Sequence, residues 1–204
     1  FPTRRSSDLS FLRHIPNLTL MAPKDEEELQ SMLALGVEHT APCAIRYPKG
    51  AGPGSSRTET TPRSILLGEG EIVHSGSDIL LISLGSTVMP ALQAINQLEH
   101  EGNYSICLFN ARFVKPLPEN QLLNLIPQFA NILIVEENSV LGGFSSAITE
   151  FLTDRDLFSS QMSIKRLGIS DEFIPHGSKS KLLNTIGLDE QGIKQELIKL
   201  LPSK

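Results

Sequence analysis

Short apolar runs that alternate with helical patterns constrain the fold of this chain more than any other feature. The run Ile79–Leu84 suits a buried strand, and a helix is predicted to begin near Pro90 and to end near Gly102. Further strands are predicted at Tyr104–Phe109, Asn131–Val135 and Ser163–Leu167, and further helices from Pro118, after Gly142-Gly143, over Ser180–Ile186 and over Gln191–Leu201. This alternation favours an α/β fold with a mostly parallel sheet that is covered on both faces.

The amino-terminal quarter carries the same signals in a shorter unit. Leu18–Met21 is typical of a buried strand, and Asp25 is suited to cap a helix whose first turn is acidic. A second strand is predicted at Cys43–Tyr47 and ends at Pro48. Residues 51–62 combine glycine, proline and small polar residues without any apolar period, which indicates a linker. The alternative is a long surface loop inside one domain.

Charge, hydropathy and cysteine content exclude several classes of protein. The chain has 204 residues and a net charge of −5, with no cluster of lysine and arginine of the kind that binds nucleic acid. Its apolar runs are far too short to cross a bilayer, so no membrane partner is expected. Cys43 and Cys107 make neither a disulfide framework nor a zinc site, and we therefore expect a cytoplasmic location.

Two segments that follow strands could carry polar chemistry. Backbone N–H groups in Leu84-Gly85-Ser86-Thr87 could hold an anion, although a tight structural turn is the favoured interpretation. Glu136-Glu137-Asn138 stands at the carboxyl end of a predicted strand, which is the edge where open α/β sheets bind ligands. These carboxylates could serve acid–base catalysis or metal binding, or they could orient loops or a subunit interface, and composition alone leaves the choice open.

The segment Arg46-Tyr47-Pro48-Lys49-Gly50 places two cations at the end of a strand. Arg46 and Lys49 could bind a phosphate or a carboxylate, and the alternative is a pair of solvated charges. The five histidines have no partner at metal-ligand spacing, although His176 precedes a predicted helix. No serine lies in a Gly-x-Ser-x-Gly elbow. The residues by themselves therefore indicate no catalytic group and no metal site.

Several segments, in order along the chain, carry a resemblance to a known family. They are residues 8–17, 21–26, 44–50 (Ala-Ile-Arg-Tyr-Pro-Lys-Gly), 110–117 (Asn-Ala-Arg-Phe-Val-Lys-Pro-Leu), 135–138 with 142–144, and 167–177 (Leu-Gly-Ile-Ser-Asp-Glu-Phe-Ile-Pro-His-Gly). Together they resemble the pyrimidine-binding and carboxy-terminal domains of the 1-deoxy-D-xylulose-5-phosphate synthase family. The resemblance runs from Asp8 to Leu201.

This resemblance implies a domain organisation and a chemistry. Residues 8–50 would be the end of the pyrimidine-binding α/β domain, 51–62 a linker, and 63–204 a three-layer transketolase carboxy-terminal domain. The family condenses pyruvate with glyceraldehyde 3-phosphate and releases carbon dioxide, as a homodimer, in the synthesis of isoprenoid, thiamine and pyridoxal precursors. Its cofactors are thiamine diphosphate and Mg²⁺. Residues 1–7 do not resemble the family, and we interpret them as non-native.

The resemblance also implies that this chain is a carboxy-terminal fragment without the reactive centre. The magnesium–diphosphate motif has no counterpart here, and the activating glutamate and catalytic histidines would lie upstream of Asp8. We therefore expect no catalytic, cofactor-binding or metal-binding residue, no cofactor bound by the chain alone, and no turnover by it. The family's aldehyde-phosphate clamp uses an arginine where this chain has Lys49, which makes Lys49 and Arg46 the candidate substrate-phosphate residues. Lysine keeps the charge but lacks the planar fork of a guanidinium.

Two other interpretations remain open. The chain could be a non-catalytic dimerisation or interaction module. It could also be the carboxy-terminal part of another thiamine enzyme, such as the β subunit of a 2-oxo acid dehydrogenase, although residues 46–50 and 112–117 favour the synthase. The truncated pyrimidine domain is expected to expose the apolar faces of Leu18–Met21 and Ala44–Tyr47, and so to make residues 1–50 mobile or prone to aggregation.

Overall fold

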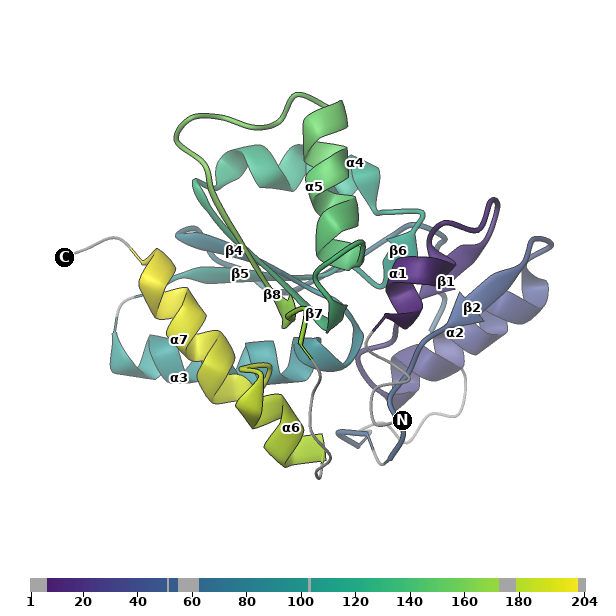
Figure 1. The fold of residues 1–204 in the computed structure, drawn as a ribbon, viewed down its shortest axis with the longest axis horizontal. Coiled ribbons are helices and arrows are strands. Elements are labelled where there is room, and N and C mark those ends of the chain that lie inside the picture. The colour runs from purple at the N-terminus through teal and green to yellow at the C-terminus, as the bar shows by residue number, and fades with distance from the viewer. Residues whose placement is uncertain (1–6, 51, 55–62, 103, 173–178, 202–204) are drawn as a thin grey trace.

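The structure, a computed structural model, describes residues 7–50, 52–54, 63–102, 104–172 and 179–201. Most of the predicted linker, the first six residues and the segment that contains His176 lie outside these ranges. Within them the chain forms a five-stranded sheet and a three-stranded sheet that lie side by side (Figure 1). No helix among the described residues is both long enough and apolar enough to cross a membrane.

The larger sheet has the strand order β3-β5-β4-β7-β8. Its strands are β3 (Glu71–His74), β4 (Ile79–Ser83), β5 (Ile106–Asn110), β7 (Asn131–Ser139) and β8 (Ser163–Ile169). β4 pairs in parallel with β5 and β7, and β7 pairs in parallel with β8, which confirms the predicted mostly parallel sheet. The edge strand β3 runs antiparallel to β5 and was not predicted.

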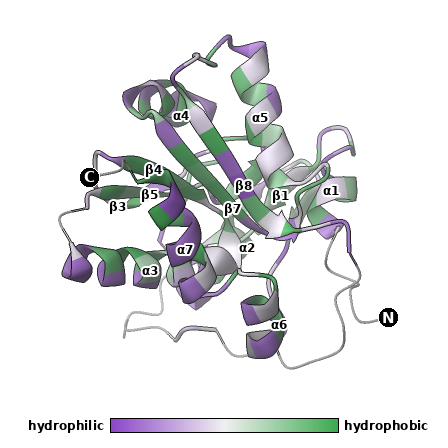
Figure 2. Ribbon diagram, turned by 60° about the vertical axis from the view of Figure 1, so that its left-hand side comes forward, coloured by the Kyte–Doolittle hydropathy of each residue, from purple (hydrophilic) through white to green (hydrophobic). Residues whose placement is uncertain are grey.

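Helices cover both faces of this sheet and make the three predicted layers (Figure 1). α3 (Val88–Glu101) and α7 (Glu190–Leu200) lie on one face, and α4 (Glu119–Leu125) and α5 (Phe144–Asp154) on the other. Short elements complete this part: η1 (Gly85–Thr87), η2 (Ile126–Gln128) and α6 (Lys179–Thr185). In Figure 2, β4 is predominantly hydrophobic, whereas α3 shows hydrophilic and hydrophobic patches along its length.

The uninterrupted apolar runs of the central strands follow from this double cover. Ile79 and Leu81 of β4 pack in the cluster that contains the buried residues of α3 and α7. Leu80 and Ile82 point the other way and join the cluster that contains residues of α4 and α5. Successive side chains of a strand face opposite sides of the sheet, so a strand buried on both faces is apolar at nearly every position.

The smaller sheet joins the amino-terminal segment to the second half of the chain. Its order is β2-β1-β6, with β1 (Thr19–Met21), β2 (Cys43–Ile45) and β6 (Phe113–Lys115). β1 pairs in parallel with β2 and antiparallel with β6. The helices of this segment are α1 (Asp8–Leu12) and α2 (Glu26–Glu38). The side chain of Asp25 accepts a hydrogen bond from the backbone N–H of Glu28, which confirms the predicted cap.

The expected exposure of Leu18–Met21 was wrong. Leu20 and Met21 are fully buried and Leu18 is 8% exposed, because β1 is the central strand of the smaller sheet. Phe113 of β6 packs against Met21 in a small cluster of its own and is also fully buried. The second expected face, Ala44–Tyr47, is half-buried at most of its positions, and only Tyr47 is exposed. β6, from the second half of the chain, thus supplies part of the cover that Leu18–Met21 was expected to lack.

Candidate functional site at the junction of the two sheets

Arg46 follows β2 and directs its side chain toward the larger sheet. Its Nη2 donates to the main-chain oxygen of Glu137 at 2.8 Å, and its Nη1 lies 3.4 Å from the Glu137 carboxylate. Ser86, in η1, donates its hydroxyl hydrogen to the same carboxylate oxygen. The Arg46 side chain is only 8% exposed, and its Nε is buried without a partner among the described residues. The structure therefore places Arg46 in an internal contact rather than in an open binding site.

Lys49 lies three residues farther along the same turn and is exposed to solvent. The two candidate phosphate residues are consequently in different surroundings, one buried against Glu137 and one open to solvent. An exposed ammonium group can meet an anion without first losing an internal partner, whereas a buried guanidinium with a paired carboxylate cannot. Of the two residues, Lys49 is the one that a phosphate can reach.

A cavity of about 340 Å³ opens beside this turn. Its walls are the first turn of α2, η1 with the start of α3, and, from the stretch after β2, Tyr47, Pro48, Gly50, Gly52 and Pro53. Its charged lining groups include Lys24, Asp25 and Glu26. The Lys24 ammonium already pairs with carboxylates beyond this lining, at 2.8 and 3.3 Å. Since the remaining charges of the wall are acidic, the cavity does not favour an anion, and a phosphate would approach Lys49 from outside it.

Glu136 caps a helix. Its two carboxylate oxygens accept the backbone N–H groups of Phe144 and Ser145, at 2.7 and 2.8 Å, in the first turn of α5. The side chain is fully buried, and burial raises the pKa of its carboxyl above the usual value. A β-carbon on Gly143 would collide with this carboxylate, which explains the glycine before the helix. The structure supports the loop-orienting interpretation for Glu136.

The other two residues of that segment have different partners. Asn138 accepts a hydrogen bond from the backbone N–H of Leu9 at 3.2 Å and donates to the hydroxyl of Ser10 at 2.9 Å, so it docks α1 onto β7. Glu137 binds Arg46, as described above. Among the described residues no three histidine, cysteine or carboxylate side chains gather as a metal site would require. The three residues Glu136-Glu137-Asn138 thus make separate structural contacts and do not form one shared catalytic or metal-binding site.

A buried ionic cluster joins α2 to the larger sheet, and no feature of the sequence predicted it. Glu28 of α2 is 2% exposed at its side chain and accepts Nε of Arg112 at 2.6 Å. The amide of Asn110 donates to the same carboxylate at 3.0 Å, and the Lys24 ammonium lies 3.3 Å from it. Glu71, at the edge of the sheet, closes the cluster by pairing with Lys24 and Arg112. The partners are up to 84 residues apart, so no local pattern signals them.

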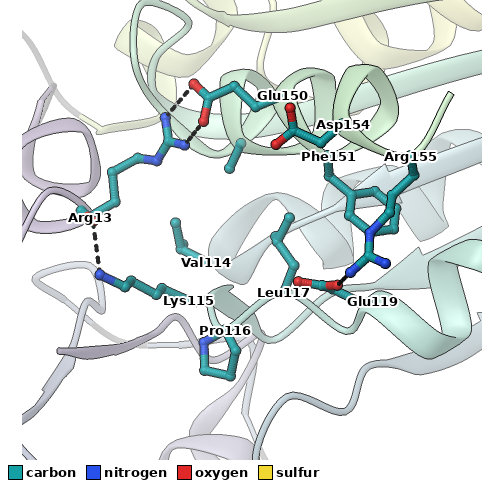
Figure 3. A pocket seen from close by; sticks show the side chains of 11 residues that line it. Arg13, Val114, Lys115, Pro116, Leu117, Glu119, Glu150, Phe151, Asp154 and Arg155 are labelled. Atoms are coloured by element: carbon teal, nitrogen blue, oxygen red, sulfur yellow. Dashed lines mark hydrogen bonds and ion pairs between the residues drawn. The ribbon is translucent and has the colours of Figure 1, made fainter. Parts of the chain in front are cut away.

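A second cavity, of about 520 Å³, lies between residues 114–119 and α5, with Arg13 of the amino-terminal segment at its side (Figure 3). Its cations are already occupied. Arg13 forms a two-pronged ion pair with Glu150, Lys115 donates to two main-chain oxygens of the amino-terminal segment, and Arg155 pairs with Glu119. Figure 3 shows the Arg13 guanidinium directed at the Glu150 carboxylate. The contacts of Arg13 and Lys115 join the amino-terminal segment to the second half of the chain, and each of these three cations of the lining already has a partner.

Comparison with known proteins agrees with this division into two parts. Residues 68–193 match the family described as transketolase, C-terminal domain, and residues 4–54 match the family described as transketolase, pyrimidine binding domain. The chain belongs to the transketolase C-terminal domain family. This confirms the family expected from the motifs, together with its α/β fold.

Two relatives of this transketolase-family chain have the same name. The chain is 46% identical over 195 residues to the 1-deoxy-D-xylulose-5-phosphate synthase of Lawsonia intracellularis, an alignment that covers 95% of this chain and 30% of that protein. It is 47% identical over 186 residues to the enzyme of the same name from Syntrophus aciditrophicus, with 91% and 28% covered. The chain therefore spans about 30% of the length of the curated relatives that it matches.

A solved structure confirms the fold of this family member. It is described as a split gene transketolase, inactive β4 tetramer, and it superposes with a TM-score of 0.81 at 24% identity. The match covers 96% of this chain and 62% of the other. At this identity the similarity establishes the α/β transketolase fold alone.

The ionic cluster of this transketolase-family chain should make its stability depend on acid pH. Burial alone would raise the pKa of Glu71, but the hydrogen bond and charge of Lys24 and the charge of Arg112 lower the pKa below its ordinary value of 4.5. A lowered pKa stabilises the folded state above the unfolded-state value, and that stability is lost as pH falls through the folded-state value. We expect the difference in melting temperature between the parent chain and Glu71→Gln to shrink from pH 5 downward. A difference that stays constant between pH 6 and pH 3 would contradict this.

Proposed function

We propose that this chain is the carboxy-terminal part of a thiamine-diphosphate-dependent 1-deoxy-D-xylulose-5-phosphate synthase. In this proposal the complete enzyme condenses pyruvate with glyceraldehyde 3-phosphate, releases carbon dioxide, and works as a cytoplasmic homodimer in isoprenoid, thiamine and pyridoxal precursor synthesis. The observation that carries it is an identity of 41–47% over 91–98% of the chain to proteins of that name, which includes both matched domains. Residues 8–50 would close the pyrimidine-binding domain, and residues 63–204 would form the carboxy-terminal domain.

The described residues do not fit thiamine diphosphate and Mg²⁺ as a binding site. No three potential metal ligands lie together among them. The buried carboxylate of Glu136 already accepts two backbone N–H groups of α5. We therefore assign neither cofactor to these residues, and we propose that Mg²⁺ and the diphosphate are held by the part of the enzyme that this chain does not span.

The contribution of this chain to substrate binding is proposed to come from the turn after β2. Lys49 is the exposed cation of that turn, and a phosphate monoester carries close to two negative charges at neutral pH. Lys49 can neutralise part of that charge as a point donor, without the two-pronged geometry of arginine. The positioned phosphate would hold the aldehyde end of the substrate toward the reactive centre, which lies elsewhere in the enzyme.

The experiment that tests this function is a domain replacement. The matching carboxy-terminal 30% of the Lawsonia intracellularis synthase would be exchanged for this chain, from Asp8 onward. The chimera is expected to convert pyruvate and glyceraldehyde 3-phosphate to 1-deoxy-D-xylulose 5-phosphate in the presence of thiamine diphosphate and Mg²⁺, followed by mass spectrometry. The chain alone is expected to give no product.

The control is the Lawsonia enzyme truncated at the same junction, which should be inactive. A chimera that is folded and dimeric but produces no 1-deoxy-D-xylulose 5-phosphate would overturn the proposal. That result would favour a non-catalytic assembly module. Turnover by the chain alone would show that the described residues contain a reactive centre after all.

A further inference from the structure

The contact between Arg46 and Glu137 crosses from the smaller sheet to the larger one. Arg46 begins the turn that contains Lys49, and Glu137 belongs to β7, 91 residues away in sequence. The Arg46 guanidinium is nearly out of reach of solvent, with its Nη1 and Nη2 directed at Glu137. The partner fixes the position of a charged group that is buried and paired in this way, because moving away from the partner would leave an unpaired charge buried in the interior.

We propose that Glu137 is a positioning residue that holds the turn 46–50 through Arg46, so that Lys49 presents its ammonium group to the substrate phosphate. This assignment rests on the proposed function, since it concerns the same phosphate. Glu137 itself touches no substrate. It acts through Arg46, and the carboxy-terminal domain thereby takes part in substrate binding without entering the reactive centre.

The backbone of the turn makes this transmission effective. The N–H of Arg46 donates to the main-chain oxygen of Met21 at 2.8 Å, which extends the pairing of β1 and β2 by one residue. Pro48 has a restricted φ angle, and Gly50 takes a φ of +123°, which other residues rarely adopt. Lys49 is three residues from Arg46, so its α-carbon stays within about 10 Å of the anchored one. Movement of Arg46 therefore displaces Lys49.

Glu137 is itself held in place. The Ser86 hydroxyl donates to the carboxylate oxygen that faces Arg46, and Ser86 lies in η1, directly after the central strand β4. The main chain of Glu137 belongs to β7, the neighbour of β4 in the larger sheet. Two adjacent strands of the most buried part of the protein thus orient the carboxylate. A rigid support of this kind is what a positioning group needs.

The first test measures the turn directly, by amide hydrogen exchange in the 204-residue chain. Glu137→Gln removes the charge but keeps the size and the main-chain oxygen. We expect the amide of Arg46, which donates to the main-chain oxygen of Met21, to exchange about tenfold faster or more, because the ion pair that holds its side chain is lost. The matched control is Glu119→Gln, which removes the carboxylate of an exposed ion pair with Arg155 and should leave residues 46–50 unchanged.

The second test measures phosphate binding, by titrating the same chain with glycerol 3-phosphate and following the amide resonance of Lys49. This probe has the phosphate ester but no aldehyde that could react with lysine. We expect Glu137→Gln to weaken binding at least about threefold, and to have no further effect once Lys49 is replaced by glutamine, since coupled groups give non-additive effects. A purely structural role for Glu137 would give additive effects. Ser86→Ala should act in the same direction, more weakly, and serves if Glu137→Gln does not fold.

The outcomes separate this inference from the function on which it rests. Unchanged exchange of the Arg46 amide in a folded Glu137→Gln chain would overturn the positioning role. Additive effects of the two substitutions on binding would overturn it as well. If Lys49→Gln leaves the affinity for glycerol 3-phosphate unchanged while Glu137→Gln speeds exchange, the positioning of the turn is supported and the phosphate assignment of the proposed function fails.

Discussion

Replacing Glu28 with glutamine is expected to lower the free energy of unfolding by about 3–5 kcal/mol, because it removes one partner of a buried ionic cluster. The carboxylate of Glu28 is 2% exposed and receives Arg112 at 2.6 Å and Asn110 at 3.0 Å. Glutamine would direct N–H groups at neighbours that are themselves donors. Arg112 would keep only its contact with Glu71, which is 32% exposed at its side chain. Urea unfolding followed by circular dichroism measures the loss.

The control for this substitution lies on the same helix. Glu38, the last residue of α2, is exposed, and Glu38→Gln should change the unfolding free energy by less than about 0.5 kcal/mol. The location of the effect is also specific, since Glu28 connects α2 to Asn110 at the end of β5 and to Arg112 just after it. Amide exchange should accelerate in α2 and β1 before it does in β4. A loss below about 1 kcal/mol for Glu28→Gln would show that the cluster does not hold the two sheets together.

Replacing Glu136 with alanine is expected to destabilise the chain by about 2–4 kcal/mol, since two buried N–H groups of α5 lose their acceptor. Glu136→Gln should cost less than the alanine variant. The amide oxygen can still accept one N–H group. The amide is also neutral, so its burial does not carry the desolvation penalty that raises the pKa of the Glu136 carboxyl. Thermal unfolding of the two variants gives the order directly.

Glu150→Ala provides the comparison for Glu136. Glu150 lies on the same helix, α5, and its carboxylate pairs with Arg13 in an ion pair that is 58% exposed on the glutamate side. Exposed pairs contribute about 0–1 kcal/mol, so this variant should be nearly as stable as the parent chain. Equal losses for Glu136→Ala and Glu150→Ala would mean that the helix cap contributes little, and would reopen the question of what the buried carboxylate does.

Local patterns predicted the elements whose burial is uniform along the chain. Ile79–Leu84 predicted β4 because a strand covered on both faces needs an apolar residue at nearly every position. Asp25 predicted the start of α2 because a helix cap depends only on residues three positions apart. β6, by contrast, has three residues and no measurable period, so its existence depended on a partner strand more than 90 residues earlier in the chain.

The candidate site divides in the same way. The sequence by itself determined which residue types stand in the turn after β2, the family that they resemble, and the alternating strands and helices that place the turn at the end of a strand. Only the tertiary structure decided that Arg46 is anchored by Glu137 while Lys49 faces solvent, and that Glu28 lies at the centre of an ionic cluster. The physical reason is the separation along the chain of the groups that interact. Capping and strand burial are set by neighbours along the chain, whereas the surroundings of a charge are set by groups that approach it only after the sheets have packed together.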